Sequence, residues 1–444
     1  MNINRKDIPY NYSGILLNIP EIEYSTFGNI KIYKYQDNSQ PLVNFKVNFK
    51  NGAAADNIPG VANYTMSMLQ SGTKNLSAGE VSEKFESLGA SYFFNAYWDE
   101  SSAGFSAMEN FFEPCFDTIV ECIFNPAFDD AEISRQRDRI SAGIMHNSAD
   151  PNYIAQVAFN KGIYRNHPYG NPRTGGLSDV AQITKKDIVD FYDLLISKSE
   201  ISIIITGNFD NDYIDKLIES KFQGVMNNSG QINIPDYVAS NLVNVIAGKD
   251  DAMQTNLRIG RQSIDRKNPD YPAFQVVNTI FGGYFLSRLN HVLRETKGLT
   301  YGIHSYLDMR QHGNVFTIST SINAEKTLES IKDIFEISMN MSIEKLEKSE
   351  IERSIEFMTG SFARSLETPK QITGIIQTLD SFELDTDFLR KFYRDLRLLT
   401  IDEIFEVQKK YFSDTNYMIA ATGNADFLST AISEFGEFEI LEIS

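Results

Sequence analysis

A strict alternation of apolar and polar residues runs through segment 42–51, LVNFKVNFKN. Val43, Phe45, Val47 and Phe49 are apolar, and the residues between them are polar. Because successive side chains point to opposite faces of a strand, this pattern predicts a strand with one face on a core and the other in polar surroundings. Strands of this kind are typical of antiparallel sheets.

Helical periodicity follows this strand along the chain. Segment 77–89 predicts an amphipathic helix, because Ser77 and Glu80 form a capping box at its start and Gly89 can end it. Strand-like sequence returns in residues 91–108. Grouped strands with helices covering one face predict an α+β fold rather than a doubly wound parallel sheet.

The chain repeats itself. Segments 183–210 and 399–426 are both 28 residues long, align without a gap and share 8 identical positions, at an offset of 216 residues. The spacing Glu-Ile-x-Arg at 132–135 recurs at 350–353, an offset of 218. Two matches at nearly the same offset predict two homologous domains, each of ordinary domain size.

The expected organisation places one domain in residues 1–225, a linker in 226–240 and the second domain in 241–444. The linker region is rich in Asn, Gly, Ser and Pro, which is typical of a connection between domains. Each domain is expected to be a mainly antiparallel sheet covered by helices.

Composition narrows the function classes. The hydrophobic content of 42% and the charged content of 23% are those of an ordinary globular protein, and the net charge of -18 disfavours nucleic acid and anionic membrane surfaces as partners. No apolar run is long enough to span a membrane. The first residues, MNINRKDIPYNYSG, lack the apolar core of a secretory signal, which predicts a cytoplasmic protein.

The residues alone show no recognisable active site. No HExxH, GxSxG, phosphate-binding loop or GxGxxG pattern occurs. His291 and Glu295 have i, i+4 spacing but fit a surface pair, since two ligands do not complete a zinc site. His304, Asp308 and His312 fall in an expected hairpin and leave a different metal site open as a minor alternative.

The order of several segments resembles the pitrilysin/insulinase-type zinc peptidases, the inverted-motif group that includes mitochondrial processing peptidase. The segments that carry the resemblance are NFKNGAAADNIPGVANYTMSMLQSGTKN, EKFESLGASYFFNAYWDES, NPAFDDAEISRQRDRISAGI, HPYGNP, GGYFLSRLNHVLRETKGLTYGIHSY and ATGNADF. They span roughly residues 42–426. Together with the duplication, they imply the two-domain fold of that family.

Active members of this family carry His-x-x-Glu-His on the first helix, where two histidines bind zinc and the glutamate is the general base. The resemblance places Asn63 and Ser67 at the histidines and Met66 at the glutamate. Ala142 and Gly143 fall where the family has its third ligand, a glutamate. This chain is therefore expected to bind no zinc and to hydrolyse no peptide by itself.

The family also uses an arginine and a tyrosine, seven residues apart, from the second domain. In HVLRETKGLTYGIHSY these are Arg294 and Tyr301. Arg294 is expected in the last turn of a helix that Gly298 can end, and Tyr301 at the start of the next strand. Held on adjoining elements, the two side chains could bind a peptide carbonyl and stabilise the developing oxyanion.

An empty zinc helix beside a retained arginine/tyrosine pair resembles one subunit of a two-chain peptidase. The leading hypothesis is the non-metal-binding subunit of a heterodimeric zinc endopeptidase, whose homologous partner carries His-x-x-Glu-His and the zinc, with unstructured peptides as substrate. A non-enzymatic peptide-binding or scaffold protein of the same fold is the alternative. The site near His304 is the third hypothesis.

Overall fold

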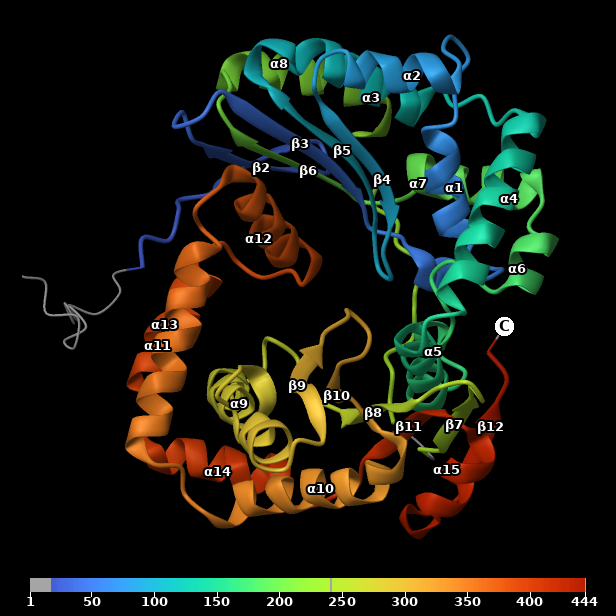
Figure 1. Ribbon diagram of the computed structural model, residues 1–444. Coiled ribbons are helices and arrows are strands. Elements are labelled where there is room, and N and C mark those ends of the chain that lie inside the picture. The colour runs from blue at the N-terminus through green and yellow to red at the C-terminus, as the bar shows by residue number, and fades with distance from the viewer. Residues whose placement is uncertain (1–16, 240–241, 444) are drawn as a thin grey trace, which may run out of the picture.

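The computed structural model describes residues 17–239 and 242–443, which form two six-stranded sheets with helices packed around them (Figure 1). The first sheet has the order β1-β2-β6-β3-β5-β4. Its strands are β1 (Glu23–Phe27), β2 (Ile30–Gln36), β3 (Leu42–Phe49), β4 (Ser91–Ala96), β5 (Ser101–Met108) and β6 (Ile201–Gly207). The second sheet has the order β12-β7-β11-β8-β10-β9. Its strands are β7 (Asn244–Gly248), β8 (Gln254–Gln262), β9 (Thr300–Asp308), β10 (Val315–Asn323), β11 (Met418–Gly423) and β12 (Phe438–Leu441).

The helices complete two repeats of one plan. In the first half they are α1 (Val61–Leu69), α2 (Ala78–Glu86), α3 (Phe112–Phe124), α4 (Asp130–Asn147), α5 (Pro151–Tyr164), α6 (Leu177–Gln182), α7 (Lys185–Ser197) and α8 (Asn211–Phe222). In the second half they are α9 (Tyr271–Asn278), the π-helical turns η5 (Thr279–Gly283) and η6 (Asn290–Thr296), α10 (Thr327–Ile343), α11 (Lys348–Arg364), α12 (Pro369–Ser381), α13 (Phe388–Leu398), α14 (Ile401–Phe412) and α15 (Ala425–Ala431). None of the described helices is long and apolar enough to cross a membrane.

The sheet topology confirms the expected α+β class. In each sheet one inner pair is parallel, β2 with β6 and β7 with β11, and the strands from there to the β4 or β9 edge are antiparallel. The outermost strands differ, because β1 runs antiparallel to β2 whereas β12 runs parallel to β7. Apart from that edge, the two strand orders are the same, as the repeat in the sequence predicts.

Strand β3 has the two faces that its alternation predicts. Val43, Phe45, Val47 and Phe49 are buried in the main core of the first half, together with residues of α2, α3 and α8. These three helices lie over one face of the sheet that contains β3 (Figure 1). The polar residues of β3 face the opposite side, which is also buried, because α12 from the second half lies against β6 and β3 there.

Helices therefore cover both faces of the sheets, not the one face that the sequence predicts. Helix α12 packs on the first sheet, and α5 from the first half packs on β7, β8 and β11 of the second. Each half lends one helix to the other half's sheet. The prediction of one covered face is wrong because α12 packs on the polar face of the first sheet, where Lys46 of β3 is bonded to Gln377 of α12, and local sequence does not reveal this contact.

Candidate functional site

Helix α1 would carry the metal site in an active family member, and its start is tightly held. The Asp56 carboxylate accepts hydrogen bonds from the backbone N–H groups of Gly60 and Ala62, each at 2.8 Å. Such bonds satisfy donors that a helix N-terminus otherwise leaves open. Gly60 has φ +99°, and a Cβ atom there would lie 2.5 Å from the Thr174 carbonyl oxygen, so only glycine fits.

The three motif positions of α1 have structural environments. Met66 is fully buried within the core of the first half. Asn63 and Ser67 are partly exposed on one turn, and the Ser67 hydroxyl donates to the Asn63 carbonyl oxygen at 2.9 Å. A thioether in a core and a hydroxyl bonded to its own helix do not form a zinc ligand set.

The position of the family's third ligand lies on α4, which packs against α1. The Tyr64 hydroxyl on α1 donates to the Ile133 carbonyl oxygen on α4, so the two helices are joined as a metal site would need. Ala142 and Gly143 are exposed there, and a Cβ added at Gly143 would meet no atom within 4 Å. The helix frame is present, but these residues do not fit a zinc ion.

Arg294 and Tyr301 belong to the second half of the chain. Arg294 lies on η6, and Tyr301 is the second residue of β9, which packs against η6. The expected helix end at Gly298 is present, with φ +62°, although the element carrying Arg294 is a π-helical turn rather than an α-helix. Such turns are frequent at functional sites.

The strand geometry turns the Tyr301 side chain outward. Where β9 pairs with β10, Tyr301 and Gly302 together face the single residue Ser321, so the ladder contains a bulge. Bulges redirect side chains away from the regular pleat. Tyr301 is 91% exposed, the highest value among the large apolar and aromatic residues described as exposed.

The Arg294 guanidinium is half-buried and lies 4.4 Å above the centre of the Phe285 ring. Within residues 17–239 and 242–443 it forms no ion pair with a carboxylate. An arginine that is held by an aromatic face and keeps its donors free can bind a carbonyl or carboxylate oxygen.

Two residues that sequence reasoning missed position this pair. The buried Asn290 amide donates to the Ile303 carbonyl oxygen at 2.9 Å and accepts from the Ile303 N–H at 3.3 Å, which joins η6 to β9. Phe285 supplies the ring beneath Arg294. Neither residue has a spacing signal in the sequence, although an asparagine within an apolar helical stripe is a hint of a buried amide.

The histidines that the sequence analysis considered as metal ligands do not form a metal site. His291 and Glu295 form an exposed pair with Nδ1 and Oε2 3.2 Å apart. Asp308 pairs with Arg310, and His312 pairs with Asp236 on the connection between the halves. Among the residues that the structure describes, no three His, Cys, Asp or Glu side chains are grouped to hold a metal ion.

Thiol chemistry is also disfavoured. Cys115 and Cys122 are buried on α3 and are not joined by a disulfide. Burial raises the pKa of Cys115 to about 11 and that of Cys122 to about 12. Both thiols are protonated at neutral pH, so they are poor nucleophiles.

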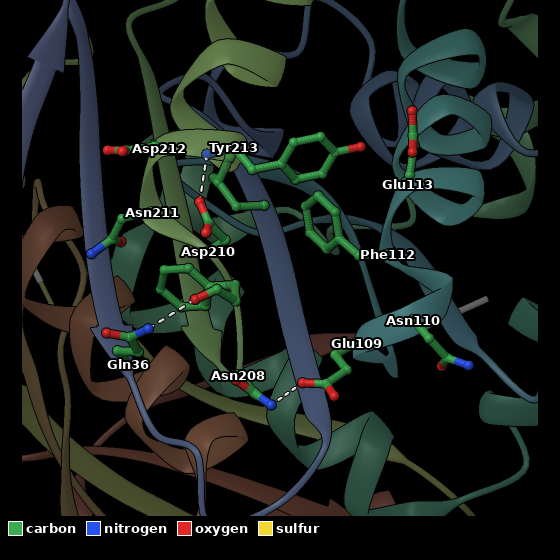
Figure 2. A pocket seen from close by; sticks show the side chains of 12 residues that line it. Gln36, Glu109, Asn110, Phe112, Glu113, Asn208, Asp210, Asn211, Asp212 and Tyr213 are labelled. Carbon is green, nitrogen blue, oxygen red and sulfur yellow. Dashed lines mark hydrogen bonds between the residues drawn. The ribbon is translucent and has the colours of Figure 1, made fainter.

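A pocket of about 740 Å³ lies between the start of α8 and the start of α3 (Figure 2). Its polar groups have structural partners: Asp210 caps α8 through the Tyr213 N–H, Asn208 donates to Glu109, and Gln36 donates to the Phe209 carbonyl oxygen. Acidic residues that cap helices and bind neighbouring amides form no catalytic arrangement here.

The fold and the site together define a peptidase-like chain of two homologous α+β halves without the metal-binding residues. Two family profiles match it: "Insulinase (Peptidase family M16)" over residues 32–176 and "Peptidase M16 inactive domain" over residues 182–358. The chain belongs to the insulinase family, peptidase family M16.

Relatives and solved structures agree with this assignment. An uncharacterized zinc protease from Rickettsia felis is 25% identical over 300 residues, 66% of this chain and 71% of the relative. A probable inactive metalloprotease, YmfF of Bacillus subtilis, is 20% identical over 313 residues, 69% of this chain and 73% of YmfF. The fold is similar to a peptidase M16 inactive domain from Pseudomonas fluorescens, with TM-score 0.83, 22% identity and coverage of 91% of this chain and 98% of that one.

Proposed function

We propose that this chain is the non-metal-binding subunit of a two-chain zinc endopeptidase. In this role Arg294 and Tyr301 bind the substrate carbonyl at the zinc site of a homologous partner that carries His-x-x-Glu-His. The observation that carries the proposal is the contrast between the two halves. The motif positions on α1 and α4 carry no zinc-binding side chains. In the second half, Arg294 has no acidic partner among the described residues, and Tyr301 is 91% exposed.

The chemistry of the pair follows from its donors. When a water attacks a peptide carbonyl, negative charge develops on the carbonyl oxygen, and fixed N–H and O–H donors stabilise it. The Arg294 guanidinium and the Tyr301 hydroxyl are such donors. Phe285 holds the Arg294 guanidinium, and the Asn290 amide fixes the β9 backbone two residues from Tyr301, so the two elements that carry the pair are ordered before substrate binds.

The test is reconstitution with a homologue that carries His-x-x-Glu-His, followed by hydrolysis of an unstructured peptide by the complex and by each chain alone. Arg294→Ala or Tyr301→Phe should lower kcat/KM of the complex by about 10²–10³-fold, the usual effect of losing one oxyanion donor. Arg135→Ala and Tyr213→Phe change the same residue types at exposed positions of the first half, and should leave kcat/KM unchanged.

Two results would contradict the proposal. One is full activity of the complex with both Arg294→Ala and Tyr301→Phe in place. The other is chelator-sensitive peptide hydrolysis by the purified chain alone. A complex that binds peptide but hydrolyses none, with every homologue tried, would favour a non-enzymatic peptide-binding or scaffold protein of this fold.

A further inference from the structure

An apolar cavity of about 250 Å³ lies between α9, α11, α12 and α13, and neither Arg294 nor Tyr301 lines it. Its walls are aromatic and aliphatic side chains, apart from Arg266 and Thr378. The Thr378 hydroxyl donates to the Gly374 carbonyl oxygen within its own helix at 3.0 Å. Arg266 is therefore the polar group that distinguishes one end of this cavity.

The cavity is present because α12 packs on the first sheet rather than on the core of the second half. Ile372, Ile376 and Leu379 of α12 pack in a small core with Ile204 of the first sheet, whereas Leu396 of α13 belongs to the main core of the second half. Helix α13 spans the space between these two cores. Its side chains Phe388 and Leu389 pack on the small core that contains α12, and Phe392 and Tyr393 pack on the main core of the second half. The helices leave the cavity between these two cores unfilled.

Arg266 is held in place without a neutralising partner. Its Nη1 donates to the Tyr271 hydroxyl at 2.9 Å, and its guanidinium lies 5.0 Å from the centre of the Phe382 ring. No carboxylate of residues 17–239 or 242–443 forms an ion pair with it. The carboxylate of Asp270 is instead bound by Lys410 and Tyr411, at 2.6 and 2.8 Å.

We propose that this cavity binds a small amphipathic carboxylate, an arylalkanoic acid whose ring enters the cavity and whose carboxylate pairs with Arg266. A planar guanidinium fixed by an aromatic face is suited to a carboxylate, and the half-buried surroundings strengthen the pair. The volume of about 250 Å³ is below the range of drug-sized ligands, so it fits a single ring with a short chain. Aromatic walls favour offset or edge-to-face contact with such a ring.

The probe is 4-phenylbutyrate, titrated calorimetrically into the full chain, with 4-phenylbutanamide as its uncharged counterpart. The acid should bind one molecule per chain, and Arg266→Gln should weaken this binding at least 10-fold while leaving binding of the amide unchanged. Lys267→Gln removes the same charge from the exposed neighbouring side chain and should not alter either affinity.

Leu389→Trp fills the cavity from α13 and should abolish binding of the acid and the amide alike. Thermal melting of each variant in the absence of ligand identifies a folding defect, and Leu389→Phe is a milder filling variant for that case. The proposal is overturned if 4-phenylbutyrate does not bind saturably. It is equally overturned if Arg266→Gln weakens the acid no more than Lys267→Gln does, or if both filled variants bind normally while folded. None of these results bears on Arg294 or Tyr301, so the two proposals stand or fall separately.

Discussion

At the scale of single residues, Lys50 and Asp380 form a deeply buried ion pair between the halves. Both side chains are at least 94% buried, with Nζ and Oδ2 2.6 Å apart. The Asp380 carboxylate also accepts from Ser202 at 2.6 Å and Tyr33 at 3.2 Å. Removing one partner of such a pair leaves a buried charge uncompensated, so Asp380→Asn should lower the free energy of unfolding by about 3–5 kcal/mol, measured by urea denaturation.

The exposed pair Lys345–Asp402 is a matched control, because it has the same 2.6 Å separation but side chains 54% and 83% exposed. Asp402→Asn should cost under about 1 kcal/mol. Adding Lys50→Met to Asp380→Asn should restore at least half of the loss, because the unpaired charge is then gone. Equal costs for Asp380→Asn and Asp402→Asn would show that burial of the first pair has no energetic consequence.

At the scale of elements, the contact of β3 with α12 has a pH dependence of its own. Lys46 on β3 is bonded to Gln377 on α12 and lies 5.6 Å from the ring centres of Phe93 and Tyr97. Burial lowers the pKa of Lys46 to about 8, although Glu100 and Asp380 act in the opposite direction. An unfolded lysine titrates near 10.4, so between these values the unfolded chain binds more protons, and the free energy of unfolding rises with pH.

Lys46→Met lacks this titration. From pH 7 to pH 10, the free energy of unfolding of the wild type should therefore gain up to about 3 kcal/mol relative to Lys46→Met, since each pKa unit corresponds to about 1.4 kcal/mol. Urea denaturation at each pH gives the difference directly. Lys348→Met, at a side chain that is 77% exposed, should run parallel to the wild type. If the free energy of unfolding of Lys46→Met changed with pH in parallel with that of the wild type, the lowered pKa of Lys46 would be contradicted.

The elements also show what sequence can and cannot predict. The alternation in β3, the capping box of α2 and the repeat of the strand order follow from local pattern, and all three are present. The resemblance to a known family identified Asn63, Met66 and Ser67 as positions on one helix. The exchange of α5 and α12 was not predictable, because a helix pattern states which face is apolar and not which sheet that face meets. Asn290 and Phe285 were missed for another reason: their partners Ile303 and Arg294 are near in sequence, but the spacing does not state how their side chains are directed across the turn from η6 to β9.

At the scale of the whole molecule, a hairpin between β9 and β10 joins the halves. Arg310 is buried there, with its guanidinium 4.5 Å from the ring centre of Trp98, 4.7 Å from Tyr164 and 4.9 Å from Tyr169. The backbone N–H of the next residue, Gln311, donates to Asp99 at 3.0 Å. Together with the exchanged helices, this junction makes each half depend on the other, so the halves are expected to unfold as one cooperative unit.

Trp98 is the single tryptophan of the chain, so its fluorescence reports on this junction. In urea, the transition followed by Trp98 emission should coincide with the one followed by far-UV circular dichroism, which is the signature of a single cooperative step.

Arg310→Met removes the cation from three ring faces, each contact contributing up to about 2 kcal/mol when desolvated. This variant should shift both transitions to lower urea and separate them, with Trp98 emission changing first. Arg165→Met, which breaks an exposed ion pair with Glu439 between the same halves, should leave them coincident. If the wild-type transitions are already separate, the halves are independent units, and the exchanged helices do not couple them.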